Sequence, residues 1–177
     1  MLEPAAFLSQ HGAILPRGRA LDVACGAGRN VLFLAEMGLR AIGVDISPAG
    51  LELARRVAMA RGLDVSLVEA DLTRDPLPAG PFDVVVCVHY LERSLFGALE
   101  AAVAPGGVLV YETFTQDQLA FPEAHPRRKE FLLAPQELLR AFPALEVEVY
   151  AEGTHRLSDG RRATLAQLIA RRRAPRP

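Results

Sequence analysis

Three aspartates stand where predicted strands end: Asp22, Asp45 and Asp71. In an open parallel sheet, the carboxyl ends of the strands meet at one edge, and ligands bind there. Asp45 follows Gly26 by 19 residues, a spacing at which an acid accepts hydrogen bonds from the ribose hydroxyls of a nucleoside. These residues therefore predict a site for a ribose-containing ligand. The alternatives are structural: a cap for the glycine turn, support for a helix start and an ordinary loop acid.

The stretch LDVACGAGRNVLFLA, residues 21–35, places Asp22 directly before a glycine loop. A pyrophosphate bound there would be repelled by the carboxylate. The G-x-G-x-x-G pattern of dinucleotide-binding loops is also broken, because Val31 stands at its last glycine. S-adenosylmethionine has an adenosine, an ammonium, a sulfonium and a carboxylate but no phosphate, so it would gain from Asp22. A dinucleotide oxidoreductase is the disfavoured reading.

Candidate catalytic residues lie at the ends of the fourth and fifth predicted strands. His89 is a candidate general base, or a structural histidine beneath the site. Tyr90 would orient a substrate or only form a wall of the pocket. Glu112 would act as a base, bind an ammonium group or form a salt bridge. His11 would lie on a lid or simply at the end of a surface helix.

The segment 115–133 is long for a connection within a compact domain, which favours a substrate loop. Its basic residues could close over an anionic acceptor, or they could form an ordinary solvated surface. They are His125, Arg127, Arg128 and Lys129. The C-terminal RRRAPRP could likewise contact RNA phosphates, but without interleaved aromatic residues it is more typical of a solvated tail.

Hydrophobic periodicity and turn residues predict an alternation of strands and helices. Such alternation indicates an α/β fold: a single doubly wound, Rossmann-like domain with a seven-stranded, mostly parallel sheet whose last strand is antiparallel. Strands are expected at 19–24, 40–46, 64–71, 82–90, 108–114, 145–153 and 162–172, the last two flanking the turn LSDGR. Helices are expected at 4–12, 30–38, 48–62, 94–104 and 135–142.

The composition excludes several classes of protein. A chain of 177 residues with 50% hydrophobic and 23% charged residues fits one globular domain, residues 1–177. A net charge of −1 gives no general attraction to nucleic acid or membranes. No apolar run is long enough to span a membrane, and no secretory signal is evident. A cytoplasmic location is therefore expected, and no metal site is predicted.

Taken together, several motifs resemble those of the class I S-adenosylmethionine-dependent methyltransferases. They are LDVACGAGRN, GVDIS, EADL, FDVVVCVHYLE, APGGVLVYETF and the closing LAQLIARR. The segments CGAGRNVLFLA and FLLAPQELLRAF look more particularly like the small tellurite-resistance-type branch. One residue departs from the family pattern, since Ala24 stands where its first glycine is usual. A slightly tighter turn is expected there, unless the position requires a positive φ.

The resemblance implies how the methionine part of the cofactor would be held. Ala24, Gly26 and Gly28 would let the backbone approach it closely. Asp22 would contact the amino group through water. Val88, at the end of the fourth strand, would offer its carbonyl near the same group.

It also implies how the adenosine part would be held. Asp45 would bind the ribose hydroxyls, and Ile46 would pack on the adenine face. Asp71 would accept a hydrogen bond from the exocyclic amine, with a backbone contact from Leu72. Asn30 would contact the cofactor directly or serve only as a helix cap.

The expected activity is in-line methyl transfer to a small-molecule acceptor, with S-adenosylhomocysteine as the product. This reaction depends mainly on positioning, because the sulfonium leaves as a neutral thioether. The family therefore has no universal catalytic residue. The strand-four segment lacks the [DNS]-P-P-[FYW] box of amino-directed DNA methyltransferases. The alternatives are an RNA or protein methyltransferase and a non-catalytic S-adenosylmethionine-binding protein.

Overall fold

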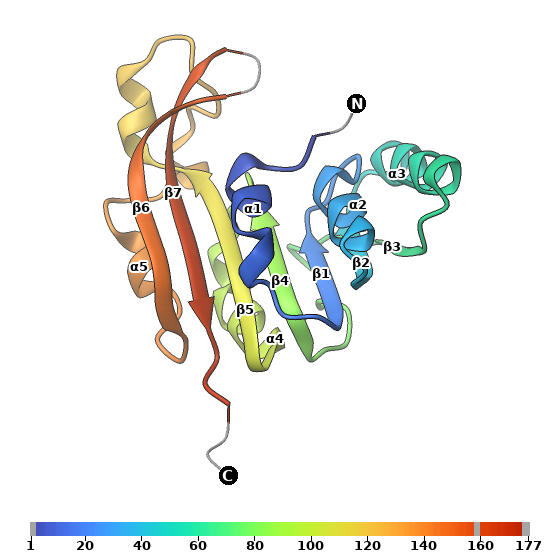
Figure 1. Ribbon diagram of the computed structural model, residues 1–177. Helices are drawn as coiled ribbons and strands as arrows, with labels where there is room; N and C mark the ends of the chain where they lie inside the picture. The colour runs from blue at the N-terminus through green and yellow to red at the C-terminus, as the bar shows by residue number, and fades with distance from the viewer. Residues whose placement is uncertain (1–2, 158–159, 175–177) are drawn as a thin grey trace.

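The computed structural model describes residues 3–157 and 160–174. Seven strands form one sheet in the order β3-β2-β1-β4-β5-β7-β6 (Figure 1). β7 is antiparallel to both of its neighbours, β5 and β6, whereas the other pairs are parallel. The predicted fold class is thus confirmed. The strands are β1 Arg19–Val23, β2 Arg40–Asp45, β3 Val65–Glu69, β4 Phe82–Val88, β5 Val103–Phe114, β6 Glu146–Arg156 and β7 Arg162–Arg171.

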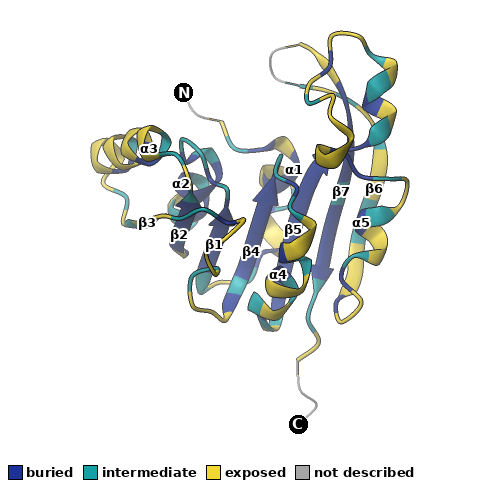
Figure 2. Cartoon of the chain, turned by 180° about the vertical axis from the view of Figure 1, so that it is seen from behind, coloured by how far each residue is buried: buried dark blue, intermediate teal, exposed yellow. Residues whose placement is uncertain are grey.

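Helices cover both faces of this sheet. One face carries α1, α2 and α3, and the other carries α4 and α5 (Figures 1 and 2). The helix bounds are α1 Ala6–Gln10, α2 Arg29–Glu36, α3 Pro48–Arg61, α4 Phe96–Ala102 and α5 Glu137–Arg140. No described helix is long and apolar enough to cross a membrane.

The central strand β4 contributes side chains to two hydrophobic cores, one on each face of the sheet. Val84 and Val86 pack into the core beneath α2 and α3, while Val85 and Cys87 pack into the core beneath α4 and α5. All four side chains are fully buried, and Figure 2 shows the middle of the sheet as its most buried part. The unbroken apolar run FDVVVCV is what a strand buried on both faces requires.

Helix α3 begins and ends as its sequence predicts. The Ser47 side chain accepts a hydrogen bond from the Gly50 N–H at 3.1 Å, and Pro48 occupies the first helical position. The helix closes at Gly62, whose left-handed conformation (φ 65°) costs a glycine little. This well-defined start fixes the chain directly after Asp45.

Two predicted elements differ from the structure more than the others do. β5 begins at Val103 instead of residue 108, because Val103 pairs with Phe82 and the register then shifts before Val84. The Pro-Gly-Gly segment is therefore an irregular part of the strand. Helix α5 covers only four residues of the predicted 135–142, because Gln136 adopts a left-handed conformation (φ 57°) at its start.

The connection 115–133 is compact. It contains two short 3₁₀ turns, η3 (Gln116–Ala120) and η4 (Lys129–Phe131). Thr115 and Leu133 form a β-bridge across its base. Phe114 and Leu132 form a small separate core with Leu165 of β7. This connection therefore supports the outer end of the β6–β7 hairpin. Residues 158–159 of the predicted LSDGR turn and 175–177 of the basic tail lie outside the described residues.

Candidate functional site

The glycine loop after β1 is held to the end of β2 by Asp45. One carboxylate oxygen accepts the Gly26 N–H at 2.7 Å, and the other accepts the Ser47 N–H at 2.8 Å. Asp45 therefore performs the helix-supporting role that its position allows. Each oxygen has a second lone-pair direction, so these bonds leave acceptor capacity for ribose hydroxyls.

Three residues of the loop have a left-handed backbone: Ala24 (φ 55°), Gly26 (φ 54°) and Gly28 (φ 89°). A Cβ atom on Gly28 would lie 2.6 Å from the Ala54 Cβ of α3, so the glycine permits close helix packing. A Cβ on Gly26 would meet nothing within 4 Å, which leaves room for a ligand. Ala24 does adopt a positive φ, so its methyl group strains the backbone instead of merely tightening the turn.

Asp22 lies beneath this loop and is 1% exposed. Its Oδ2 accepts the Val31 N–H at 2.9 Å, whereas no described group hydrogen-bonds to its Oδ1. Burial raises the pKa of this carboxyl to about 7, although the Val31 N–H and the nearby Arg29 charge oppose that shift. A buried carboxyl with an unpartnered oxygen suits a cationic ligand group, as the S-adenosylmethionine ammonium would be.

A cavity of about 220 Å³ opens beside the ends of β1, β2 and β3, and we call it the adenosine pocket. Asp45 and Asp71 supply its acidic groups, and no lysine or arginine lines it. Ile46 is 61% exposed and lies at the wall of this pocket, where a bound adenine would cover it. The lining residues are Ala24, Asp45, Ile46, Ala70, Asp71, Leu72, Thr73 and Tyr90. This lining fits an uncharged nucleoside better than a phosphate.

Asp71 is more constrained than its predicted role requires. One oxygen accepts both the N–H and the hydroxyl of Thr73, at 3.0 and 2.7 Å. These bonds lower the pKa of the Asp71 carboxyl. Asp71 therefore stabilises the turn at Thr73, and it also places a carboxylate that can accept hydrogen bonds at the wall of the pocket.

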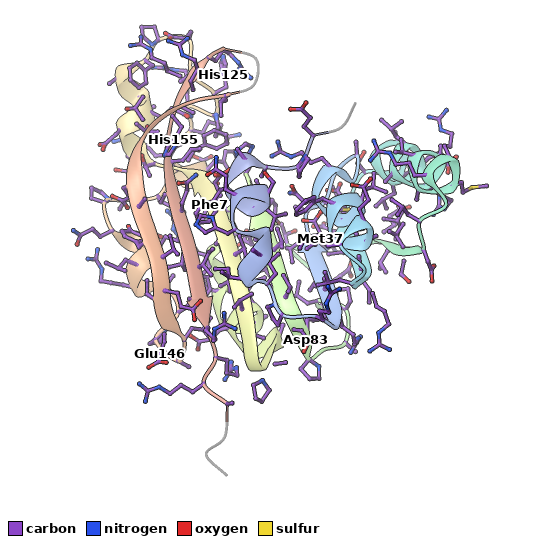
Figure 3. The ribbon with its side chains drawn as sticks, viewed as in Figure 1. Phe7, Met37, Asp83, His125, Glu146 and His155 are labelled. Carbon is purple, nitrogen blue, oxygen red and sulfur yellow. The ribbon has the colours of Figure 1, made fainter. Side chains whose placement is uncertain are left out.

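A second cavity, of about 350 Å³, lies beyond the ends of β4 and β5, and we call it the acceptor pocket. His89 and Glu112 form part of its wall, together with Arg29 from the start of α2. Residues 3–6 and the outer end of the β6–β7 hairpin enclose the remaining sides. Figure 3 shows His155 of β6 at this end of the sheet.

The structure separates the three predicted catalytic residues. His89 and Glu112 share the acceptor pocket, with His89 Nε2 and Glu112 Oε1 3.3 Å apart. Tyr90 lines the adenosine pocket instead, where burial raises the pKa of its phenol. Val88 is buried at the end of β4.

Asn30, His11 and two basic residues of 115–133 were also candidates for contact with a ligand, and each contacts another residue of the protein instead. Asn30 Oδ1 accepts the Ala5 N–H at 2.9 Å and so holds the N-terminal segment against α2. His11 Nδ1 lies 2.8 Å from the Phe7 carbonyl within the same helix end. Among the basic residues of 115–133, Arg127 donates to the Phe121 carbonyl and Arg128 pairs with Glu130. None of the residues that line the acceptor pocket comes from that segment.

Sequence reasoning missed the far wall of this pocket. His155, Arg156 and Arg161 come from the hairpin, and Gln167 comes from the middle of β7. Gln167 donates from Nε2 to Glu112 Oε2 at 2.6 Å and stands opposite Glu112 in the strand register. A polar residue within the apolar run TLAQLIA was the available signal. Finding its partner required the strand register.

Comparison with known proteins identifies similar sequences. Residues 20–107 match the family described as Methyltransferase domain. A demethylmenaquinone methyltransferase of Thermus thermophilus is 41% identical over 104 residues, covering 54% of this chain and 47% of that protein. A ubiquinone biosynthesis O-methyltransferase of Idiomarina loihiensis is 28% identical over 163 residues, covering 80% and 66%. The chain thus spans between about half and two thirds of these relatives.

Solved structures share the fold. TehB from Haemophilus influenzae superposes with a TM-score of 0.78 at 20% identity, covering 94% of this chain and 61% of TehB. The magnesium protoporphyrin IX methyltransferase ChlM from Synechocystis PCC 6803, with bound SAH, gives a TM-score of 0.69 at 20% identity, covering 94% and 78%. The likeness to TehB agrees, at the level of the fold, with the branch indicated by the motifs.

Proposed function

Because this chain belongs to the class I S-adenosylmethionine-dependent methyltransferases, we propose that it transfers the methyl group of S-adenosylmethionine to a small-molecule acceptor. The chain spans about half to two thirds of the length of these curated relatives, so this proposal depends on the site that the chain contains. That site has one pocket suited to an adenosine and another suited to an acceptor, at the same edge of the sheet.

The observation that carries the proposal is the chemistry of the adenosine pocket. Its charged groups are Asp45 and Asp71, and the nearby buried Asp22 has an unpartnered oxygen. A phosphate-bearing cofactor would meet like charges at this pocket. A nucleoside with an ammonium and a sulfonium would instead be stabilised by the same charges.

The chain's residues would mainly position the reactants. Asp45 would hold the ribose, and the open space over Gly26 would admit the methionine part. S-adenosylmethionine supplies an activated methyl group when bound. The acceptor pocket would then hold its occupant about 3–3.5 Å from that methyl carbon, which is worth up to ~7–11 kcal/mol of the barrier.

The acceptor pocket favours catalysis over cofactor binding alone. In a non-catalytic binding protein, side chains would fill the space beside His89 and Glu112, whereas a cavity of about 350 Å³ is present there. That volume lies within the usual range for small-ligand sites. The quinone names of both relatives support a small acceptor, and the name of the ubiquinone biosynthesis O-methyltransferase supports an oxygen nucleophile.

Thermal unfolding tests the cofactor assignment. S-adenosylhomocysteine at 100 times its dissociation constant should stabilise the fold by ~2.7 kcal/mol and raise the melting temperature by roughly 5–10 °C. NAD is the matched control, because it has the same ribose and adenine but carries a pyrophosphate, and it should cause no shift. Stabilisation by NAD alone would refute the assignment. A screen with isotopically labelled S-adenosylmethionine would then identify the acceptor.

A further inference from the structure

His89 has an unusual backbone at the end of β4. Its φ of 59° lies in the left-handed region, which is strained for a side-chain-bearing residue and is often associated with function. Its N–H donates to the Glu112 carbonyl at 2.7 Å, and its ring lies 4.7 Å from the Phe114 ring. Neighbours on β5 therefore fix both the backbone and the ring of His89.

The two ring nitrogens of His89 face different groups. Arg29 Nη2 lies 3.2 Å from Nδ1, and Glu112 Oε1 lies 3.3 Å from Nε2. A guanidinium can only donate, so Nδ1 must accept and the proton of the neutral ring belongs on Nε2. The Nε2–Glu112 contact falls outside hydrogen-bond geometry, as is common for catalytic pairs before a substrate binds.

Glu112 is arranged to remain a carboxylate. It is 5% exposed, and its Oε2 accepts the hydrogen bond from Gln167. Burial alone would raise the pKa of this carboxyl, but the contacts with His89 and Gln167, aided by the Arg29 charge, lower it below its ordinary value. Glu112 is thus suited to orient His89 and to stabilise a positive ring.

We propose that Glu112 and His89 form a catalytic dyad whose basic atom is His89 Nδ1, and that the methyl acceptor is a hydroxyl or thiol that must lose a proton. This inference rests on the proposed function. A carboxylate facing one ring nitrogen while the other accepts the substrate proton is the established division of labour in acid–histidine pairs. The Arg29 N–H now occupies the position at Nδ1 that the acceptor O–H or S–H would take.

The reaction balances with the groups present. The acceptor proton moves to His89 Nδ1, and the oxygen or sulfur electron pair forms the new bond to the methyl carbon. The methyl–sulfur bond breaks, and its electron pair remains on sulfur as a neutral thioether. His89 becomes an imidazolium, which the Glu112 carboxylate stabilises. Displaced from Nδ1, Arg29 remains a nearby positive charge for the developing anion.

The first test is the ring tautomer, which requires no acceptor. With ¹⁵N-labelled histidine in the full chain, neutral His89 should show a protonated Nε2 and an unprotonated Nδ1, assigned by loss of the signals in His89→Asn. Asparagine tolerates the left-handed backbone, so this variant should fold. Arg29→Met should keep the same tautomer if Glu112 determines it. A protonated Nδ1 in either protein would overturn the dyad.

The second test uses turnover of the acceptor found in the labelled-cofactor screen. His89→Asn should lower kcat by about 100-fold or more, while retaining the melting-temperature rise caused by S-adenosylhomocysteine. Glu112→Gln should also keep that rise and should lower kcat with little change in KM. Methylation of a tertiary amine, or full kcat in His89→Asn, would overturn the inference. Failure of S-adenosylhomocysteine to bind the parent protein would instead refute the proposed function, and the tautomer result would still decide whether Glu112 orients His89.

Discussion

At the scale of single residues, the glycine loop after β1 contains backbone strain at Ala24. Ala24 has a φ of 55°, where an alanine costs about 1–2 kcal/mol relative to glycine. Ala24→Gly removes that cost but increases the entropy of the unfolded chain, worth about 0.4–1 kcal/mol. We expect a net gain in unfolding free energy of about 0.5–1 kcal/mol, measured by denaturant titration.

The control for that substitution lies in the same loop. Ala27 is not among the residues with a positive φ, so Ala27→Gly should only destabilise the protein. Equal effects at the two positions would show that backbone strain is not the cause.

The raised pKa of Asp22 predicts how folding stability and ligand affinity depend on pH. Its native pKa is raised to about 7 from an ordinary value of 3.8, so this carboxyl favours the folded state below pH 4 and loses that contribution as the pH rises to about 7. An ammonium-bearing ligand should favour the ionised form. S-adenosylhomocysteine affinity should therefore increase between pH 5.5 and 7 and then level off, as measured by calorimetry.

Two comparisons separate Asp22 from other titrating groups. The affinity of 5′-methylthioadenosine, which lacks the amino-acid part, should vary little over the same pH range. Asp22→Asn should bind S-adenosylhomocysteine more weakly at pH 7 and without the rise. A rise of equal size in this variant would assign the titration to another group.

At the scale of elements, the loop glycines divide between packing and ligand access. Gly28→Ala would place a methyl group 2.6 Å from the Ala54 Cβ, forcing α2 away from α3. We expect a loss of about 2–4 kcal/mol, which combines overpacking with left-handed strain, and a melting temperature lower by roughly 5–15 °C.

Gly26→Ala is the matched substitution, because its φ is also positive but its Cβ would meet nothing within 4 Å. It should cost only about 1–2 kcal/mol in thermal unfolding. It should nevertheless abolish most of the stabilisation by S-adenosylhomocysteine, since the methyl group would occupy the proposed ligand path. Normal ligand stabilisation would place that path elsewhere.

At the scale of the whole molecule, local patterns predicted the order of the elements and the edge of the sheet at which the two pockets lie. The run at β4, the cap at Ser47 and the acid at or near the end of each of the first three strands are local signals. The β5 start was wrong because Val103 gains a partner in Phe82. Asn30 and Gln167 also acquired their roles from partners distant in sequence, Ala5 and Glu112.

Predicting which residues line each pocket likewise required knowledge of contacts between residues distant in sequence. Adjacent residues His89 and Tyr90 face different cavities, a separation that composition and spacing do not contain. One wall of the acceptor pocket combines residues 3–6 with residues of the β6–β7 hairpin, which lie about 150 residues later in the sequence. Local sequence therefore predicted the lining of the adenosine pocket better than the lining of the acceptor pocket.

The position of β7 between β5 and β6 also constrains how the protein can be synthesised. β6 pairs only with β7 among the described strands, so it leaves the ribosome before its partner exists. Until residues 162–171 emerge, β5 likewise presents an open edge with Val110 and Tyr111 at its centre. An unpaired edge of this kind is prone to aggregation. The final strand therefore closes the nascent sheet, and a pause in translation just before it would expose the chain at its most vulnerable stage.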